Sequence, residues 1–219
     1  MKKFIKMSLM AAVAVAGLTT TASAGGLGTV TDGMVTVKDK TVMALTDRNA
    51  EVALQIGVAD ADGVDSSTSV KLRVTADCSL VQDTRVTASV EKHTDGYEVA
   101  VEGRKVIFKD NGIDLVGSVK IAQVKEELGH APNLESTNAL VGVGAVLPVG
   151  NVAKVESGIR FGVSSESYVD SIVEPYFAMS GEVSNGYRIG TEVNFRTFNG
   201  DNGGDLDTAN IGFFVAKSF

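Results

Sequence analysis

Cysteine, proline and tryptophan are scarce or absent in this chain of 219 residues, which has one Cys, three Pro and no Trp. The single cysteine, Cys78, excludes a disulfide framework and a zinc site built from several cysteines. No heptad repeat is present, and apolar residues are plentiful, which excludes coiled-coil and disordered classes. Lys and Arg number 20 against 27 Asp and Glu and do not cluster. Nucleic acid is therefore not expected as a partner, because it is bound by clustered cations.

The first 24 residues are organised as a secretory signal peptide. Three lysines precede an apolar stretch over residues 7–18, and a small-residue A-x-A sequence ends at Ala24. A membrane anchor is disfavoured, because a spanning helix needs roughly 20 apolar residues. Cleavage after Ala24 removes three Lys and no acidic residue, so the net charge falls from −7 to −10. No later segment is a long apolar helix, so entry into a membrane requires strands.

From residue 50 to the C-terminus, apolar and polar residues alternate with a period of two. This period predicts strands with one apolar and one polar face. The alternation slips at Gly103, where we favour a bulge within one strand over a hairpin. Pro175 lies inside a predicted strand although it lacks a ladder donor. Residues 25–49 alternate too briefly for a confident strand and are interpreted as a periplasmic segment or as extra strands.

The connections favour a membrane barrel over a soluble β-sandwich, which alternates in the same way. Segments of about ten residues, enough to cross a bilayer at a tilt, are joined alternately by tight turns and by longer polar loops. The tight joins are 78–83, 110–112, 148–151 and 181–186, and the longer ones are 60–68, 125–138, 164–170 and 197–207, with the short 93–96 as an exception. For residues 50–219 we predict an all-β, closed antiparallel up-and-down transmembrane β-barrel of about ten strands, with eight or twelve as alternatives.

The chain resembles the small outer-membrane β-barrel proteins of Gram-negative bacteria, the porin-like and opacity-type barrels, at the level of the superfamily. The resemblance rests on the signal peptide, the alternating strands and a last strand with Phe213, Val215 and the terminal Phe219. It implies a place in the cell outer membrane, contact with outer-membrane lipid and lipopolysaccharide, and an assembly signal formed by these three residues and read by the barrel-assembly machinery through Phe219. Lys217 departs from the family, which usually has Tyr or another apolar residue two places before the end.

Charged side chains of both signs occupy the polar row that faces the predicted lumen. A barrel of eight to ten strands is just wide enough for its own side chains, and charges in a tight lumen need partners to offset desolvation. We therefore expect these groups to pair across the lumen, with a narrow solute path as the alternative. They are Lys71, Arg73, Glu98, Lys120, Arg160, Glu174, Arg188, Glu192 and Arg196.

No metal, cofactor or catalytic site is predicted. The acidic segments 60–65 and 201–207 lack the bidentate Glu that ends a calcium loop, and they are interpreted as solvated turns. The two histidines, His93 and His130, fall in predicted external loops outside any hydrolase motif. Cys78 is expected as a free thiol at a periplasmic turn. The segment 142–144, Gly-Val-Gly, is interpreted as small residues in a curved strand.

The predicted function is that of a non-catalytic integral outer-membrane protein with a structural, surface-interaction or narrow-pore role. Two alternatives remain open. One is an outer-membrane barrel enzyme that hydrolyses lipid or peptide with His93 or His130, and the other is a soluble periplasmic β-sandwich that acts as a binding module. The sequence carries no signal for an oligomeric state.

Overall fold

Almost all of the described chain is β-strand. The computed structural model describes residues 36–37, 40–41, 50–61, 64–78, 81, 83–94, 96–126, 134–200 and 205–219. The strands are β1 (Thr36–Val37), β2 (Lys40–Thr41), β3 (Glu51–Ala61), β4 (Val64–Asp77), β5 (Thr84–His93), β6 (Gly96–Asp110), β7 (Ile113–Glu126), β8 (Leu134–Val149), β9 (Ala153–Ser164), β10 (Val169–Ser184), β11 (Tyr187–Gly200) and β12 (Leu206–Ser218). β1 and β2 pair with each other. The predicted signal peptide and the rest of residues 25–49 lie outside the described residues.

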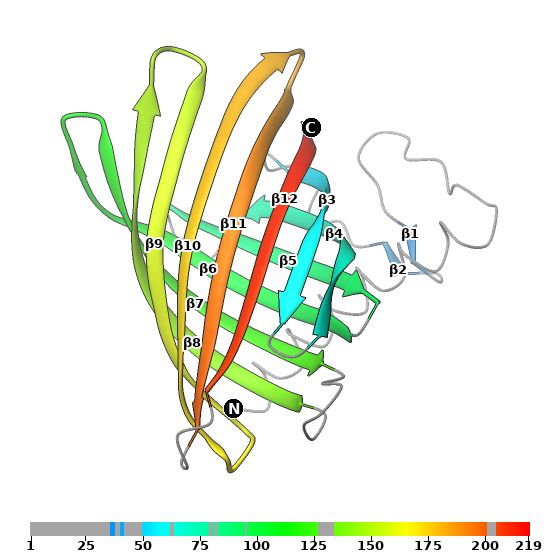
Figure 1. Cartoon of the computed structure of the whole chain (residues 1–219). Helices are drawn as coiled ribbons and strands as arrows, with labels where there is room; N and C mark the ends of the chain where they lie inside the picture. The colour runs from blue at the N-terminus through cyan, green and yellow to red at the C-terminus, as the bar shows by residue number, and fades with distance from the viewer. Residues whose placement is uncertain are drawn as a thin grey trace.

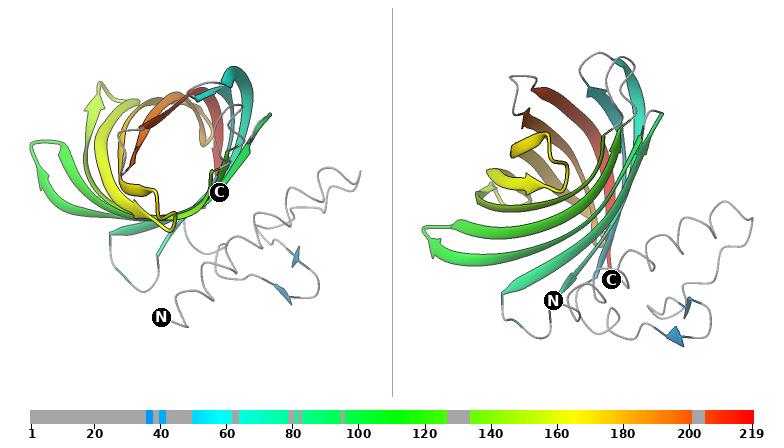
Figure 2. Two further views of the ribbon diagram at one scale, coloured as in Figure 1. Left: turned by 60° about the horizontal axis from the view of Figure 1, so that its bottom comes forward. Right: turned by 90° about the horizontal axis from the view of Figure 1, so that it is seen from below.

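Strands β3 to β12 form one closed antiparallel barrel in which each strand pairs with its neighbours in sequence (Figures 1 and 2). The barrel closes where β12 pairs with β3, from Ser218 opposite Glu51 to Thr208 opposite Ala61. The predicted antiparallel barrel of ten strands is confirmed. The β-sandwich alternative is wrong, because strands β3 to β12 form one sheet that closes on itself instead of two sheets packed face to face.

Alternation along each strand separates two environments. On β3, Leu54 and Ile56 face outward with 50% and 58% of their surface exposed, whereas Gln55 between them faces inward and is 1% exposed. The outward row continues around the barrel as a band of Val, Ile, Leu and Phe, with Phe213 74% exposed. An apolar outer band around a polar interior is the arrangement of a barrel that spans a membrane.

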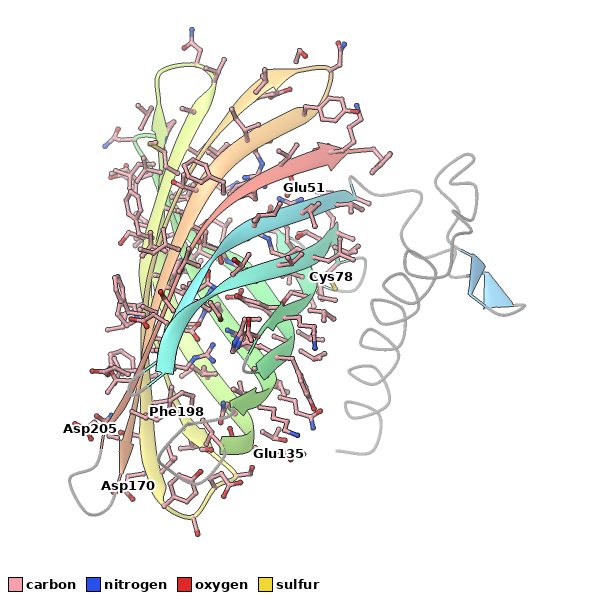
Figure 3. The ribbon with its side chains drawn as sticks, turned by 45° about the vertical axis from the view of Figure 1, so that its right-hand side comes forward. Glu51, Cys78, Glu135, Asp170, Phe198 and Asp205 are labelled. Atoms are coloured by element: carbon pink, nitrogen blue, oxygen red, sulfur yellow. The ribbon has the colours of Figure 1, made fainter. Side chains whose placement is uncertain are left out.

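The two ends of the barrel differ in their connections. Two-residue turns, Asn111-Gly112 and Asn185-Gly186, join β6 to β7 and β10 to β11, with positive φ at both positions of each turn. Such turns match the twist of the paired strands. Glu51 and Cys78 lie at this end, whereas Glu135 and Asp205 lie at the other (Figure 3). The four connections at this end span six, two, three and two residues, whereas those at the other end span two, two, seven, four and five. Because the longer connections of outer-membrane barrels lie outside and short turns face the periplasm, we assign the Glu51 end to the periplasm.

Several details differ from the sequence prediction. β6 runs unbroken through Gly103, and the bulge lies instead between Val106 and Phe108. The predicted loop over residues 60–68 is mostly strand, since only residues 62 and 63 separate β3 from β4. Loops are polar and so are lumen-facing strand residues. Polar composition therefore made the predicted loop longer than it is and the two flanking strands shorter.

Pro175 fits within β10 because the ladder is interrupted beside it. It is paired with Ile159 of β9 on one side. On the β11 side the pairs run from Val173 opposite Thr197 to Tyr176 opposite Asn194, in an unchanged register, without pairs for the two residues between. The missing donor is thus accommodated without a shift of the strand.

Among the residues that the structure describes, there is no helix with the length and apolar character that a membrane span requires.

The turn at Gly186 gives a stability prediction. Gly186 has φ of 75°, and an added Cβ would lie 3.2 Å from the backbone oxygen of Ser218, whereas Gly150 has φ of 63° and open space around it. Positive φ alone costs a substituted alanine about 1 kcal/mol. We expect Gly186→Ala to lower the free energy of unfolding by about 1–2 kcal/mol and more than Gly150→Ala. Urea unfolding in lipid vesicles measures both, and equal losses would contradict the close approach.

Candidate functional site

Inward-facing charged side chains dominate the lumen. The structure places all nine residues of the predicted lumen row among those that line one internal cavity. They come from β4, β6, β7, β9, β10 and β11, and the alternation of each strand aims them inward. The nine are Lys71, Arg73, Glu98, Lys120, Arg160, Glu174, Arg188, Glu192 and Arg196.

Glu174 on β10 is the centre of the largest group of charges. Its carboxylate accepts from Lys120 Nζ at 3.2 Å and from Arg160 Nη1 at 2.7 Å. Arg196 Nε donates to its other oxygen at 2.6 Å. The side chain is 1% exposed. Three cations from three strands thus converge on one carboxylate that water does not reach.

Glu98 and Glu102 extend this group on β6. Glu98 lies 3.0 Å from Lys120 Nζ and 2.6 Å from Arg196 Nη2. Glu102 accepts from Arg160 Nε at 3.0 Å and from Nη2 at 2.8 Å. Every cation that touches Glu174 therefore also contacts a carboxylate of β6.

A second group centres on Glu192 of β11. Lys71 Nζ lies 3.2 Å from the Glu192 carboxylate and 3.4 Å from Glu91, and Arg73 also donates to Glu192. Asn194 Nδ2 donates to the same carboxylate at 2.8 Å. Strand β11 faces β4 across the lumen, although about 120 residues separate them in the chain.

Two further pairs lie nearer the periplasmic end. Arg188 donates from Nη2 to Glu51 at 2.5 Å and from Nη1 to Ser180 Oγ at 2.9 Å. Arg104 donates to both carboxylate oxygens of Glu156, from Nη1 at 3.1 Å. Among the described residues these groups bring together seven acidic and seven basic side chains, each with at least one partner. We call these fourteen side chains the lumen network.

Five members of the lumen network were not in the predicted row. Glu102 and Arg104 are absent from the predicted row because the apolar alternation slips at Gly103, although β6 keeps its parity there. Continuing the parity of β6 through that glycine would have found both. The other three are Glu51, Glu91 and Glu156. Glu51 and Glu156 lie just before the strands predicted there. Glu91 lies on the polar face of a predicted strand but is not in the predicted lumen row.

Glycines make room for aromatic side chains inside the barrel. The Tyr176 ring occupies the space that a Cβ on Gly158 would need, at 2.6 Å from that position, and its hydroxyl does the same at Gly144. Arg160 stacks on the ring with its guanidinium carbon 4.0 Å from the centroid. Of the two glycines interpreted as fitting a curved strand, Gly144 thus makes space for the Tyr176 ring and Gly142 for the Arg160 side chain.

An apolar cluster covers the lumen network on one wall near the external end. It contains Val124, Leu134, Leu140, Ile172 and Phe198, all buried. These side chains point inward by parity, with Ile172 next to Glu174 in the inward row of β10. Because apolar neighbours exclude water, they strengthen the ion pairs beneath them and also raise the cost of leaving one unpaired.

An internal cavity of about 380 Å³ remains beside the lumen network. It is lined by His93 near the external end and by Arg85 near the periplasmic end of β5. At a rise of ~3.3 Å per residue and a tilt of ~40°, these residues lie about 20 Å apart along the axis. The cavity therefore extends along much of the barrel wall.

The remaining predicted sites fall at the barrel ends. Cys78 is a half-buried free thiol after β4. Asp60 and Asp207 come from adjacent strands, and Thr197 Oγ1 donates to Asp207 at 2.6 Å. Within the described ranges no group of three His, Cys, Asp or Glu side chains could hold a metal ion. His93 lines the cavity, whereas His130 lies outside the described residues, so the hydrolase alternative stays a prediction.

The residues of the predicted assembly signal lie at the end of β12. Phe213 and Val215 face outward, and Phe219 is 62% exposed. Lys217, the departure from the family pattern, donates to the backbone oxygen of Asn185, and its Nζ lies 4.2 Å from the centre of the Tyr187 ring. The lysine therefore holds the last strand to the β10–β11 turn.

No protein-family model matches the chain, and no curated protein matches its sequence. The fold is similar to that of an outer membrane channel from Pseudomonas putida F1, with 9% identity over 84% of this chain and 100% of that chain and a TM-score of 0.47. It is also similar to Neisserial surface protein A, with 9% identity over 78% of this chain and 97% of that chain and a TM-score of 0.40. The outer membrane enzyme PagL is 11% identical over 75% of this chain and 97% of that chain, with a TM-score of 0.39.

At these identities the likeness is one of fold. The chain's own geometry supplies the rest: a sheet without an edge, an apolar outer band and a charged, paired interior. This is the architecture of a small β-barrel of the cell outer membrane.

Proposed function

We propose that the protein is a non-catalytic outer-membrane barrel that anchors its external connections at the cell surface, with a lumen closed to solutes larger than water and small ions. The observation that supports this proposal is the pairing of all fourteen charges of the lumen network. A wide pore leaves charged walls facing water, whereas each charge of the lumen network is bonded to an opposite one. The barrel then serves as a rigid support, and interaction with the surroundings falls to the connections at the external end.

The lumen network is well suited to closing the barrel because its members are long and come from opposite walls. Going once round the barrel, the register advances by about 12 residues, which for ten strands corresponds to a backbone radius of about 10 Å. Glutamate and arginine side chains from opposite walls meet across this span, as Arg196 of β11 and Glu98 of β6 do at 2.6 Å. The paired side chains therefore occupy the centre of the lumen.

A conductance measurement tests this closure. Planar-bilayer recording of the full chain should give no stable steps of the size of a porin. The double variant Glu174→Ala/Arg196→Ala removes one anion and one cation, keeps the lumen neutral, and shortens two of the side chains that fill it. We expect this variant to show conductance steps that the parent lacks.

The matched control is Asp77→Ala/Arg85→Ala, which removes an ion pair at the periplasmic end whose side chains are 41% and 48% exposed. It should stay as silent as the parent. Unboiled gel mobility in SDS verifies that each protein is a folded barrel. Porin-sized steps from the folded parent would refute the closed lumen.

A stability comparison tests the role of Glu174 as the centre of the lumen network. Replacing Glu174 by Gln leaves Lys120, Arg160 and Arg196 each short of one partner in a dry site, and removing one member of a buried pair costs about 3–5 kcal/mol. Glu102→Gln affects Arg160 alone at a carboxylate that is 15% exposed. We expect the loss in the free energy of unfolding to be clearly larger for Glu174→Gln. Urea unfolding in vesicles gives both values, and a Glu102 effect as large as that of Glu174 would contradict this ranking.

A further inference from the structure

Three side chains form a row on the outer surface near the external end of the barrel. Lys92 on β5 is the cross-strand partner of Tyr97 on β6, and Tyr97 is in turn the partner of Lys125 on β7. Cβ atoms of such partners lie about 5 Å apart, so the two lysines flank the tyrosine at a separation of about 10 Å. All three have the outward parity of their strands. We call them the Lys-Tyr-Lys row.

The Lys-Tyr-Lys row lies at the upper limit of the apolar band. On β5 the outward residue before Lys92 is Val90, and on β6 the outward residue after Tyr97 is Val99. On β7 the outward residues before Lys125 are Gln123 and, before it, Ile121. Tyrosine is enriched where the hydrocarbon meets the headgroups, and lysine extends from this level toward them. The row is therefore placed at the headgroups of the outer leaflet.

The two lysines differ from most basic residues of the barrel. Within the part of the chain that the structure describes, neither Lys92 nor Lys125 forms a salt bridge, whereas every basic member of the lumen network is paired. Glu135 on β8 is the next cross-strand neighbour of Lys125. Two and three strands from Lys92, on β3 and β12, the outward residues near this level include Asp60 and Asp207, which are exposed acids. Positive charge thus faces the headgroups at one place.

We propose that the Lys-Tyr-Lys row binds the phosphate group of an anionic lipid of the outer leaflet. Two ammonium groups on either side of a phenol hydroxyl offer charge and hydrogen-bond donors to one phosphate. The aliphatic residues below the row contact the acyl chains of the same lipid. At the external end, the outward residues Glu135, Asp60 and Asp207 are exposed acids, and they repel such a headgroup, so the binding is local. The inference depends on the orientation of the barrel in the membrane and is independent of whether the lumen conducts.

The test uses the full chain in vesicles of phosphatidylcholine with and without phosphatidic acid, a lipid with a phosphate monoester. Native mass spectrometry after release from the vesicles reports how much phosphatidic acid stays bound. We expect the parent protein to retain it over phosphatidylcholine, and Lys92→Gln/Lys125→Gln to bind on the order of 20-fold more weakly, from the loss of two lysine contacts with an anionic lipid surface. Glu135→Gln should bind as tightly as the parent or more tightly.

The matched control is Lys105→Gln/Lys109→Gln, which removes the same charge from exposed lysines of β6 near the periplasmic end. It should retain the lipid as the parent does. Unboiled gel mobility shows that every variant is folded. The proposal is overturned if the parent shows no preference for phosphatidic acid, if the Lys92/Lys125 variant retains it, or if the control loses it equally. Tight binding of inorganic phosphate alone would also overturn the assignment to a lipid.

Discussion

Closure of the hydrogen-bond ladder between β3 and β12 is the constraint on which the rest of the molecule depends. A bilayer offers no water to unpaired backbone groups, so a membrane sheet must have no edge. Here the seam runs without interruption from Glu51 and Ser218 to Ala61 and Thr208. The contacts that hold it extend to the last residue, since the Phe219 amide donates to the Ala50 oxygen at 2.9 Å. Once the sheet is closed, each residue faces either lipid or lumen.

The closed sheet then decides what the interior must contain. Polar side chains that face a narrow lumen lose much of their water, and single charges there are costly. The lumen network offsets this desolvation cost by pairing opposite charges, since Glu174 is shared by three cations and Glu192 by two. Glycines at positions 144 and 158 leave the space into which Tyr176 and Arg160 pack. Shape and charge thus fill much of the lumen together.

Much of the fold could be predicted from the sequence, because the alternation of apolar and polar residues indicates which side chains of a strand face lipid. Strand β11 shows this best, since Ile189, Val193 and Phe195 alternate with charged and amide residues along its length. The orientation of the nine predicted lumen residues follows from the same parity. Aromatic residues were less informative, because they are not restricted to the outer girdle: Tyr176, Phe198 and Phe214 are buried in the lumen.

The partners within the lumen could not be predicted. Glu192 meets Lys71 and Arg73 only because the barrel closes with a particular stagger, and stagger is a property of all ten strands rather than of any local pattern. The bulge after Val106 shows the same limit, since it shifts parity at a place where neither glycine nor a turn residue stands. The bounds of the external connections could not be predicted either, because loops and lumen-facing strand residues are both polar.

Site-directed spin labelling along β3 is the most direct test of the central claim that this sheet crosses a membrane with one face to lipid and one to the lumen. With Cys78 replaced by Ser, single nitroxides at positions 52 to 58 are compared in vesicles for collision with oxygen and with a polar relaxation agent. The account predicts a period of two, with oxygen access highest at positions 52, 54, 56 and 58. A profile without this period, or polar access at the outward positions, would contradict it.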